Sequence, residues 1–273
     1  GALPLRYCNI PIAFSLKGTG VFLLRGENAK DLSQEEIRDL LKKPVITDGE
    51  ALCVLRERGV EFSADARPFD TSTVVEQFTE HPINRGRAGK RWPGAWFGGA
   101  TEYEITDARE GTEFVGEYVR TATGAAEPTG HYSAAVVRTG QNAKWAVFGF
   151  DLWDRSISTD KRNRMLQAAE YISGIRQAAE LVTPIQAIVL PRTDASGKLV
   201  CVSIVNCTVA DSGELEVILR NMGDMDQVLF LSQYGKASML SVSVNENGEK
   251  TVLIPDLKAW SVGTIFTEEK GGQ

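Results

Sequence analysis

Two aspartates near the end of a strand-like run carry the most direct chemical signal in this sequence. Asp151 and Asp154 follow the apolar run KWAVFGF in the segment DLWDRS. In an open α/β sheet, residues beyond the carboxyl ends of the strands face the ligand crevice. Two carboxylates there can act as acid and base, or can bind sugar hydroxyls. An aspartate after a strand also caps turns and pairs with arginines such as Arg155, so the catalytic, ligand-binding and structural interpretations all stay open.

Two tryptophans in a glycine-rich stretch are the second candidate. Trp92 and Trp96 lie in GKRWPGAWFGG, residues 89–99, with basic side chains just upstream. Exposed indoles among polar residues commonly mark a contact surface, because they combine a large apolar area with a polar edge. Stacking on a sugar ring and docking on a neighbouring subunit both suit them. The structural alternative is a loop that folds back and buries its tryptophans.

The thiols and imidazoles give weaker signals. Cys53 lies inside a predicted helix between apolar neighbours, whereas a reactive thiol needs an electropositive and partly open setting. We expect Cys53 to be buried, and His81 and His131 to be lone surface histidines. With two histidines and no Cys-x-x-Cys pair, we predict no metal site. The signatures of phosphate-binding loops, dinucleotide-binding folds and esterase elbows are missing from the sequence too, so we predict no cofactor and assign no catalytic residue.

Composition narrows the classes of partner. The chain has 273 residues and a net charge of -6, which disfavours a nucleic-acid partner, because such proteins usually carry a basic stripe. Its apolar runs are far shorter than the roughly 20 residues of a membrane-spanning helix, so no membrane partner is predicted. No signal peptide is visible and Gly1 replaces an initiator methionine, so we expect a segment of a longer protein, with its targeting signal elsewhere.

The first part of the chain alternates strand-like and helix-like patterns. Ser33 with Glu36 and Thr47 with Glu50 have capping-box spacing, which predicts two helix starts. Strand-like runs at 20–26 and 60–64 flank these helices, and the order strand, helix, helix, strand favours a parallel α/β layer.

The middle of the chain is more varied. Residues 65–95 are polar and rich in Arg, Gly and Pro, which predicts mainly a surface excursion. Four β-like runs follow, and then an amphipathic helix that begins at Ser158 or Thr159 and buries Met165, Ala169 and Ile172. The four runs are 100–106, 113–120, 131–139 and 144–153.

After residue 180 the pattern changes to short strands alone. Seven strand-like runs alternate with turn signals such as DASG, DSG, NMGD and NENG. Short strands at this spacing predict an antiparallel β-sandwich. We therefore predict two domains: α/β for residues 1–178 and a small β-sandwich for residues 179–273.

Three segments in combination carry a resemblance to a known family. They are LSQEEIRDLLKKPVITDGEALCVLRERGV (32–60), WAVFGFDLWDRSISTDKRNRMLQAAEYISG (145–174), and PRTDASGKLVCVSIVNCTVADSGELEVIL (191–219) with LIPDLKAWSVGTI (253–265). In this order they resemble the C-terminal region of large bacterial glycoside-hydrolase-like proteins. There a catalytic barrel precedes a class I glutamine amidotransferase-like (flavodoxin-like) domain, related to the trimerisation domain of some β-galactosidases, and a β-sandwich follows.

The resemblance implies an accessory role. Amidotransferase chemistry needs a cysteine in a glycine-flanked elbow and a His-x-Glu motif, and neither Cys53 nor the segments after His81 and His131 match. It implies a non-catalytic accessory or oligomerisation segment, whose partners are its own upstream catalytic domain and further copies of itself. It also favours a periplasmic or secreted location. The alternatives are a carbohydrate-binding module that uses Trp92 and Trp96 to hold a glycan, and an independent hydrolase that uses Asp151 and Asp154.

Overall fold

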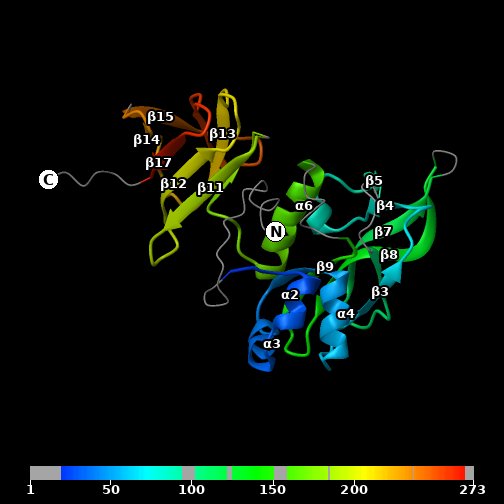
Figure 1. Ribbon diagram of the computed structural model, residues 1–273. Helices are drawn as coiled ribbons and strands as arrows, with labels where there is room; N and C mark the ends of the chain where they lie inside the picture. The colour runs from blue at the N-terminus through cyan, green and yellow to red at the C-terminus, as the bar shows by residue number, and fades with distance from the viewer. Residues whose placement is uncertain are drawn as a thin grey trace. The chain divides into compact units, whose positions relative to one another are not determined.

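The computed structural model describes residues 20–93, 102–121, 125–150, 159–183, 185–235 and 237–267. The chain divides into two compact units between Ile175 and Arg176 (Figure 1). Each unit has a core and a sheet of its own, so the two are described separately.

The first unit begins with a small parallel layer. Its strands β1, β2 and β9 pair in parallel, β2 lying between the other two. Helices α2 and α3 connect β1 to β2, and helix α4 follows β2. The strands are β1 (Phe22–Leu24), β2 (Val45–Asp48) and β9 (Lys144–Phe148), and the helices are α2 (Gly26–Asp31), α3 (Gln34–Leu40) and α4 (Gly49–Glu57).

Local capping chemistry fixes two of these helix starts. Ser33 caps α3, and its capping box with Glu36 is present as predicted. At α4 the cap is Asp48, whose side chain accepts a hydrogen bond from the Ala51 amide. The predicted capping box of Thr47 and Glu50 is therefore wrong: Thr47 lies within strand β2, and its hydroxyl donates to the Leu24 carbonyl at 2.9 Å.

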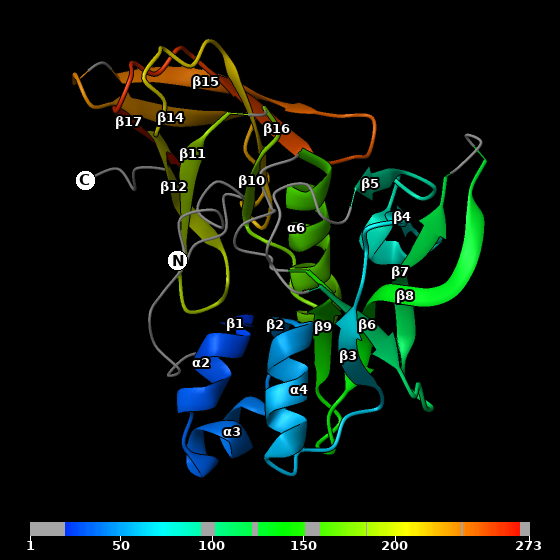
Figure 2. The same ribbon diagram turned by 45° about the vertical axis from the view of Figure 1, so that its right-hand side comes forward.

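Antiparallel strands make up the larger part of the first unit. The sheet runs β1-β2-β9-β8-β7-β4-β5, and β6 pairs with both β3 and β8. β7 and β8 form a long hairpin that curves away from helices α2 to α4 (Figure 2). These elements are β3 (Asp65–Phe69), β4 (Val75–Phe78), the short helix η1 (Pro82–Asn84), β5 (Arg91–Pro93), β6 (Glu102–Thr106), β7 (Glu113–Arg120), β8 (Glu127–Arg138) and helix α6 (Thr159–Ser173).

The predicted flavodoxin-like α/β fold is wrong. Of the residues that the structure describes, 43% are in strands and 17% in helices, and the sheets are curled. Strands β3, β4 and β5 arise from the 65–95 stretch, for which we predicted a surface excursion. The strand predicted at 60–64 leaves a single bridge, between Phe62 and Thr139, and β3 begins only at Asp65. In the described part of the first unit, antiparallel strand pairings therefore outnumber the parallel pairings of β1, β2 and β9.

The second unit is an antiparallel β structure. All seven predicted strands are present, and β10 is an eighth. The order is β10-β13-β16-β15-β14-β17-β12-β11. The strands are β10 (Ala179–Leu181), β11 (Ala187–Thr193), β12 (Leu199–Asn206), β13 (Leu215–Leu219), β14 (Gln227–Ser232), β15 (Ala237–Val244), β16 (Lys250–Ile254) and β17 (Val262–Phe266).

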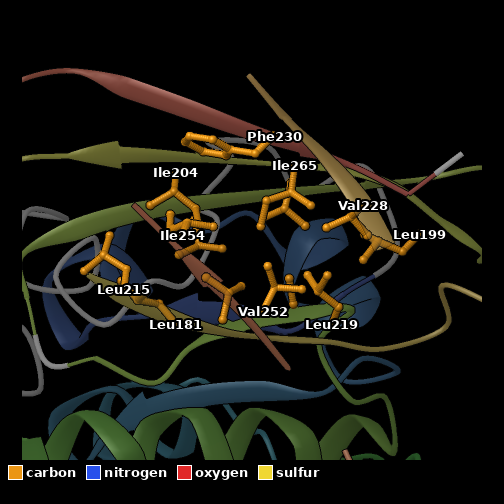
Figure 3. Packing of buried hydrophobic residues seen from close by; sticks show 14 of the residues in the cluster. Leu181, Leu199, Ile204, Leu215, Leu219, Val228, Phe230, Val252, Ile254 and Ile265 are labelled. Carbon is orange, nitrogen blue, oxygen red and sulfur yellow. The ribbon is translucent and has the colours of Figure 1, made fainter. Parts of the chain in front are cut away.

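Strand β15 folds this sheet over on itself. Its first part, up to Ser241, pairs with β14, and its last part, from Val242, pairs with β16. The inner faces of both halves meet in one apolar core, where Ile204, Val252 and Ile265 are fully buried (Figure 3). Burying a side chain of this size contributes about 1.5–3 kcal/mol. The alternation of apolar and polar residues in the sequence is what predicted this sandwich-like packing.

Candidate functional site

The four predicted site residues are placed unevenly. Asp151, Asp154 and Trp96 lie outside the described residues. Trp92 lies in β5, directly opposite Glu76 of β4. It is half-buried, and its Nε1 is buried with no hydrogen-bond partner in the described part of the chain. Directly paired residues of an antiparallel sheet project to the same face. The side chains of Trp92 and Glu76 therefore lie on the same face of the sheet.

Glu76 is the centre of a buried charge cluster, which we define as Glu76, Ser133, Lys161 and Arg164. The Glu76 Oε1 atom accepts hydrogen bonds from Arg164 Nη1 at 2.6 Å and from Ser133 Oγ at 2.8 Å. Glu76 is 2% exposed and Arg164 is 1% exposed. Burial acts to raise the pKa of the Glu76 carboxyl, but the charges of Arg164 and Lys161 outweigh it, so the pKa lies below its usual value.

Helix α6 and the sheet position this cluster together. Arg164 comes from α6, and its guanidinium lies over the rings of Phe78, at 4.2 Å, and Phe148, at 5.0 Å. Its Nη2 donates to the Val115 carbonyl at 3.0 Å. Gly116 leaves the space that the cluster needs, because a Cβ there would lie 2.3 Å from Ser133 Oγ.

Some polar atoms of the cluster have no hydrogen bond. Glu76 Oε2, Arg164 Nε and the neighbouring Trp92 Nε1 are buried and have no hydrogen-bond partner within the described ranges. Lys161 Nζ lies 4.0 Å from Glu76 Oε2. Buried polar atoms usually bind an ordered water or another polar group. As a carboxylate with a lowered pKa and almost no exposure, Glu76 is suited to holding α6 on the sheet and not to donating a proton.

His131 belongs to a second ion cluster, in which only the Glu104 carboxylate is buried. It hydrogen-bonds Glu104 through Nδ1, and Glu104 also accepts from Arg67 Nε at 2.5 Å. The His131 ring lies 4.7 Å from the ring of Phe69. The Glu104 side chain is only 4% exposed, whereas that of His131 is 38% exposed. The prediction of a lone histidine is therefore wrong at this position.

His81 is also held by other groups. Its Nδ1 accepts from the Ile83 amide at 3.2 Å, and its Nε2 lies 3.3 Å from Glu113 Oε2, which assigns the proton to Nε2. Tyr171 donates its hydroxyl to the same Glu113 oxygen. Burial lowers the pKa of His81, and burial together with the Glu113 contact raises the pKa of Tyr171 to about 12. The His81 side chain is only 8% exposed and contacts Glu113, so the prediction of a lone surface histidine is wrong here.

The carboxyl ends of the parallel strands hold a carboxylate from the chain itself. Asp48 accepts from the Gly26 amide at 3.1 Å and from the Ala51 amide at 2.8 Å, at the starts of α2 and α4. These are the donors that would bind a phosphate in a nucleotide-binding fold. Asp48 therefore already satisfies the anion-binding capacity of these helix ends, in line with the missing phosphate-loop signatures.

The remaining candidates are structural. The Cys53 thiol donates to the Ala66 carbonyl at 3.1 Å, and burial raises its pKa to about 11, so it is not an activated nucleophile. Among the described residues there is no His, Cys, Asp and Glu grouping fit to hold a metal. The described helices are all too short or too polar to cross a membrane.

Comparison with known proteins gives a likeness of fold. No family model matches this chain, and no curated protein matches it significantly. Its fold is similar to that of the α-L-fucosidase isoenzyme 2 from Paenibacillus thiaminolyticus, with a TM-score of 0.59 and 12% identity over 97% of this chain and 44% of that enzyme. A Paenibacillus sp. cycloisomaltooligosaccharide glucanotransferase, complexed with cycloisomaltoheptaose, aligns with 86% of this chain and 49% of its own at 9% identity and a TM-score of 0.25, too weakly to support an argument.

The chain spans less than half of the length of the fucosidase, at an identity that shows a shared fold only. The fucosidase is a glycoside-hydrolase-related protein, which agrees with the sequence resemblance in this broad sense, whereas the likeness does not show an amidotransferase-like trimerisation domain.

Proposed function

We propose that this chain is a non-catalytic accessory segment of a carbohydrate-active protein. The observation that carries the proposal is the fold likeness to an α-L-fucosidase, which includes nearly all of this chain but only 44% of that enzyme. More than half of the fucosidase thus has no counterpart here, and we assign catalysis in the parent protein to a part of that kind. The accessory segment would support the parent by bringing copies together or by walling the substrate cleft.

The chemistry of the described residues supports this assignment. Glycoside hydrolysis needs two accessible carboxyl groups, one of them with a raised pKa so that it can donate a proton. Glu76 and Glu104 are buried and each accepts from an arginine, and the pKa of Glu76 is lowered. Both carboxylates therefore act as ion-pair partners that stabilise the fold.

An activity assay on the chain tests the proposal directly. We expect no release of nitrophenol from a panel of nitrophenyl glycosides that includes the α-L-fucoside, with an authentic α-L-fucosidase as the positive control. Turnover that Asp151→Asn or Asp154→Asn abolishes would overturn the accessory function and favour the independent hydrolase. Turnover that survives both substitutions would overturn it as well and would place catalysis elsewhere in this chain.

The supporting role makes a separate expectation for the parent protein. Deleting this segment should lower the oligomeric state or the specific activity of the parent, measured by sedimentation and by initial rates. A parent that keeps both after the deletion would contradict a supporting role. Glycan contact at Trp92 and Trp96 stays a prediction, with the limit that the Trp92 indole nitrogen faces inward.

A further inference from the structure

One end of the second unit gathers four of its connections. Ser232 of β14 pairs with Gly263 near the start of β17, and Val205 of β12 pairs with Val262. The end of β16 pairs with the start of β13 in the same way. The registers therefore bring the connections β10–β11, β12–β13, β14–β15 and β16–β17 to one end, which we call the loop end. Loops held at one end of a rigid β scaffold commonly carry binding function.

Buried hydrogen bonds fix two of these connections to each other. Asn206 is fully buried, and its Nδ2 donates to the carbonyls of Ala210 and Leu257 at 2.9 and 3.0 Å. Asp211 adds a contact from the side, accepting from the Ala259 amide at 3.2 Å and from Lys258 Nζ at 2.6 Å. The β12–β13 and β16–β17 connections are thus held as one preorganised surface.

Two large aromatic side chains project from the loop end. Trp260 is 65% exposed and Tyr234 is 67% exposed. The backbone amide of Gln233, next to Tyr234, donates to the Val262 carbonyl at 2.9 Å. The two aromatic residues therefore lie on adjoining connections. From chain reach, the two Cα atoms are at most roughly 16 Å apart.

The backbone of Trp260 supplies an independent observation. Its φ is +57°, in the left-handed region that glycine adopts freely and that a bulky residue rarely enters. Strained backbone that displays an exposed side chain points to a use for that side chain, since glycine would fold more easily here.

We propose that the loop end is a glycan-binding surface in which Trp260 and Tyr234 stack on sugar rings. A sugar presents an apolar C–H face and a rim of hydroxyls, so it needs an aromatic face beside polar groups. Asp211, Asp256 and Lys258 supply those groups: Lys258 Nζ lies 3.2 Å from Asp256 Oδ2, and all three side chains are at least 39% exposed. The choice of a glycan over a protein surface rests on the proposed function.

Binding to an oligosaccharide tests this surface. The whole chain is screened on a glycan array, and the best ligand is titrated by calorimetry. We expect Trp260→Ala to weaken binding by at least about tenfold, and Tyr234→Ala to weaken it more for longer oligosaccharides than for short ones. Val244→Ala is the matched control, because Val244 is 66% exposed at the opposite end of β15, and it should bind as the unaltered chain does.

A glycine substitution separates binding from folding. Trp260→Gly removes the ring and relieves the left-handed backbone, so the thermal midpoint should stay constant or rise while binding weakens by at least about tenfold. A midpoint that falls in Trp260→Gly would show that the tryptophan serves the fold, and would overturn the proposal.

The remaining outcomes are decisive as well. Failure to bind any glycan, or equal binding by all variants, would overturn the glycan surface while leaving the accessory function intact. Self-association that Trp260→Ala abolishes would assign the surface to a second copy of the chain and would overturn the proposal that it binds a glycan. Hydrolysis of nitrophenyl glycosides would overturn the accessory function alone, so the failures of the two proposals are distinguishable.

Discussion

Replacing Arg164 with methionine tests how much the buried charge cluster stabilises the first unit. Arg164→Met keeps much of the side-chain length but removes the charge 2.6 Å from Glu76 Oε1. Breaking a buried ion pair from one side costs about 3–5 kcal/mol, because the other charge stays buried without its partner. The loss of the contacts with Phe78 and Phe148 acts in the same direction.

Because of Lys161, we expect a loss of stability near the lower end of the range of about 3–5 kcal/mol. At an effective dielectric constant of about 20, a unit charge 2.6 Å away interacts by about 6 kcal/mol, and one 4.0 Å away by about 4 kcal/mol, before desolvation. Lys161 therefore still compensates part of the Glu76 charge in the variant. We expect the free energy of unfolding to fall by about 3 kcal/mol.

Urea unfolding followed by tryptophan fluorescence measures this loss. Four of the five tryptophans belong to the first unit by sequence, so the signal reports mainly on it. The double variant Glu76→Gln with Arg164→Met removes both charges and should cost at least about 2 kcal/mol less than the sum of the single changes. A loss below about 1 kcal/mol in Arg164→Met, or strict additivity in the cycle, would refute the proposed coupling.

The ionisation of Glu76 also predicts how the free energy of unfolding changes with pH. Because the folded-state pKa of Glu76 is lowered, its stabilisation is complete above the ordinary value of 4.5 and is lost as the pH falls through the folded-state pKa. In Arg164→Met, the Arg164 charge no longer lowers the pKa of Glu76 against the effect of burial, so this pKa should rise. The loss of stability at acid pH should then shrink or reverse. An unchanged slope of unfolding free energy against pH would contradict this.

Two further predictions concern close packing and thiol reactivity. Gly149→Ala should cost at least about 2 kcal/mol, because its Cβ would lie 2.0 Å from the Tyr103 carbonyl oxygen, whereas Gly140→Ala, with open space around its Cβ, should change the unfolding free energy by less than about 0.5 kcal/mol in the same urea experiment. Cys53 is partly buried, and not fully buried as we expected from the sequence. With a pKa raised to about 11, it should resist iodoacetamide at pH 8 in the folded chain and react in urea, as followed by peptide mass spectrometry. Rapid labelling in the folded chain would contradict the raised pKa.

The second unit was predictable from sequence because its inward positions are apolar. Strand β12 alternates more and less buried residues, and the predicted turns place Gly197, Gly213, Gly223 and Gly248 at positive φ. Alternation fixes which face of a strand is buried, and glycine marks where the chain reverses. The short β10 carried too few residues to show a pattern.

The first unit was harder to predict because charged residues take inward positions. Glu76 of β4 is 2% exposed, so the alternation that would indicate this strand is broken by its own buried residue. Glu104 is also buried, at 3% exposure, although its strand β6 lies within the predicted run 100–106. Their partners are far away in the chain: Arg164 is 88 residues from Glu76, and His131 is 27 residues from Glu104. Spacing along the sequence shows pairs of this kind only when they are neighbours on one element, so the polar 65–95 stretch gave no sign of its strands.

The edges of both sheets bear on how copies of this protein can meet. An unpaired strand edge invites another chain to add a strand, and short edges or edge prolines block that addition. Five strands at the ends of the described sheet pairings are three residues long or contain a proline: β1, β5 and β10 have three residues, β3 contains Pro68, and β11 contains Pro191. These edges are thereby protected against strand addition, whereas residues 237–241 of β15 pair with β14 alone and leave a longer edge at which a second copy could add a strand.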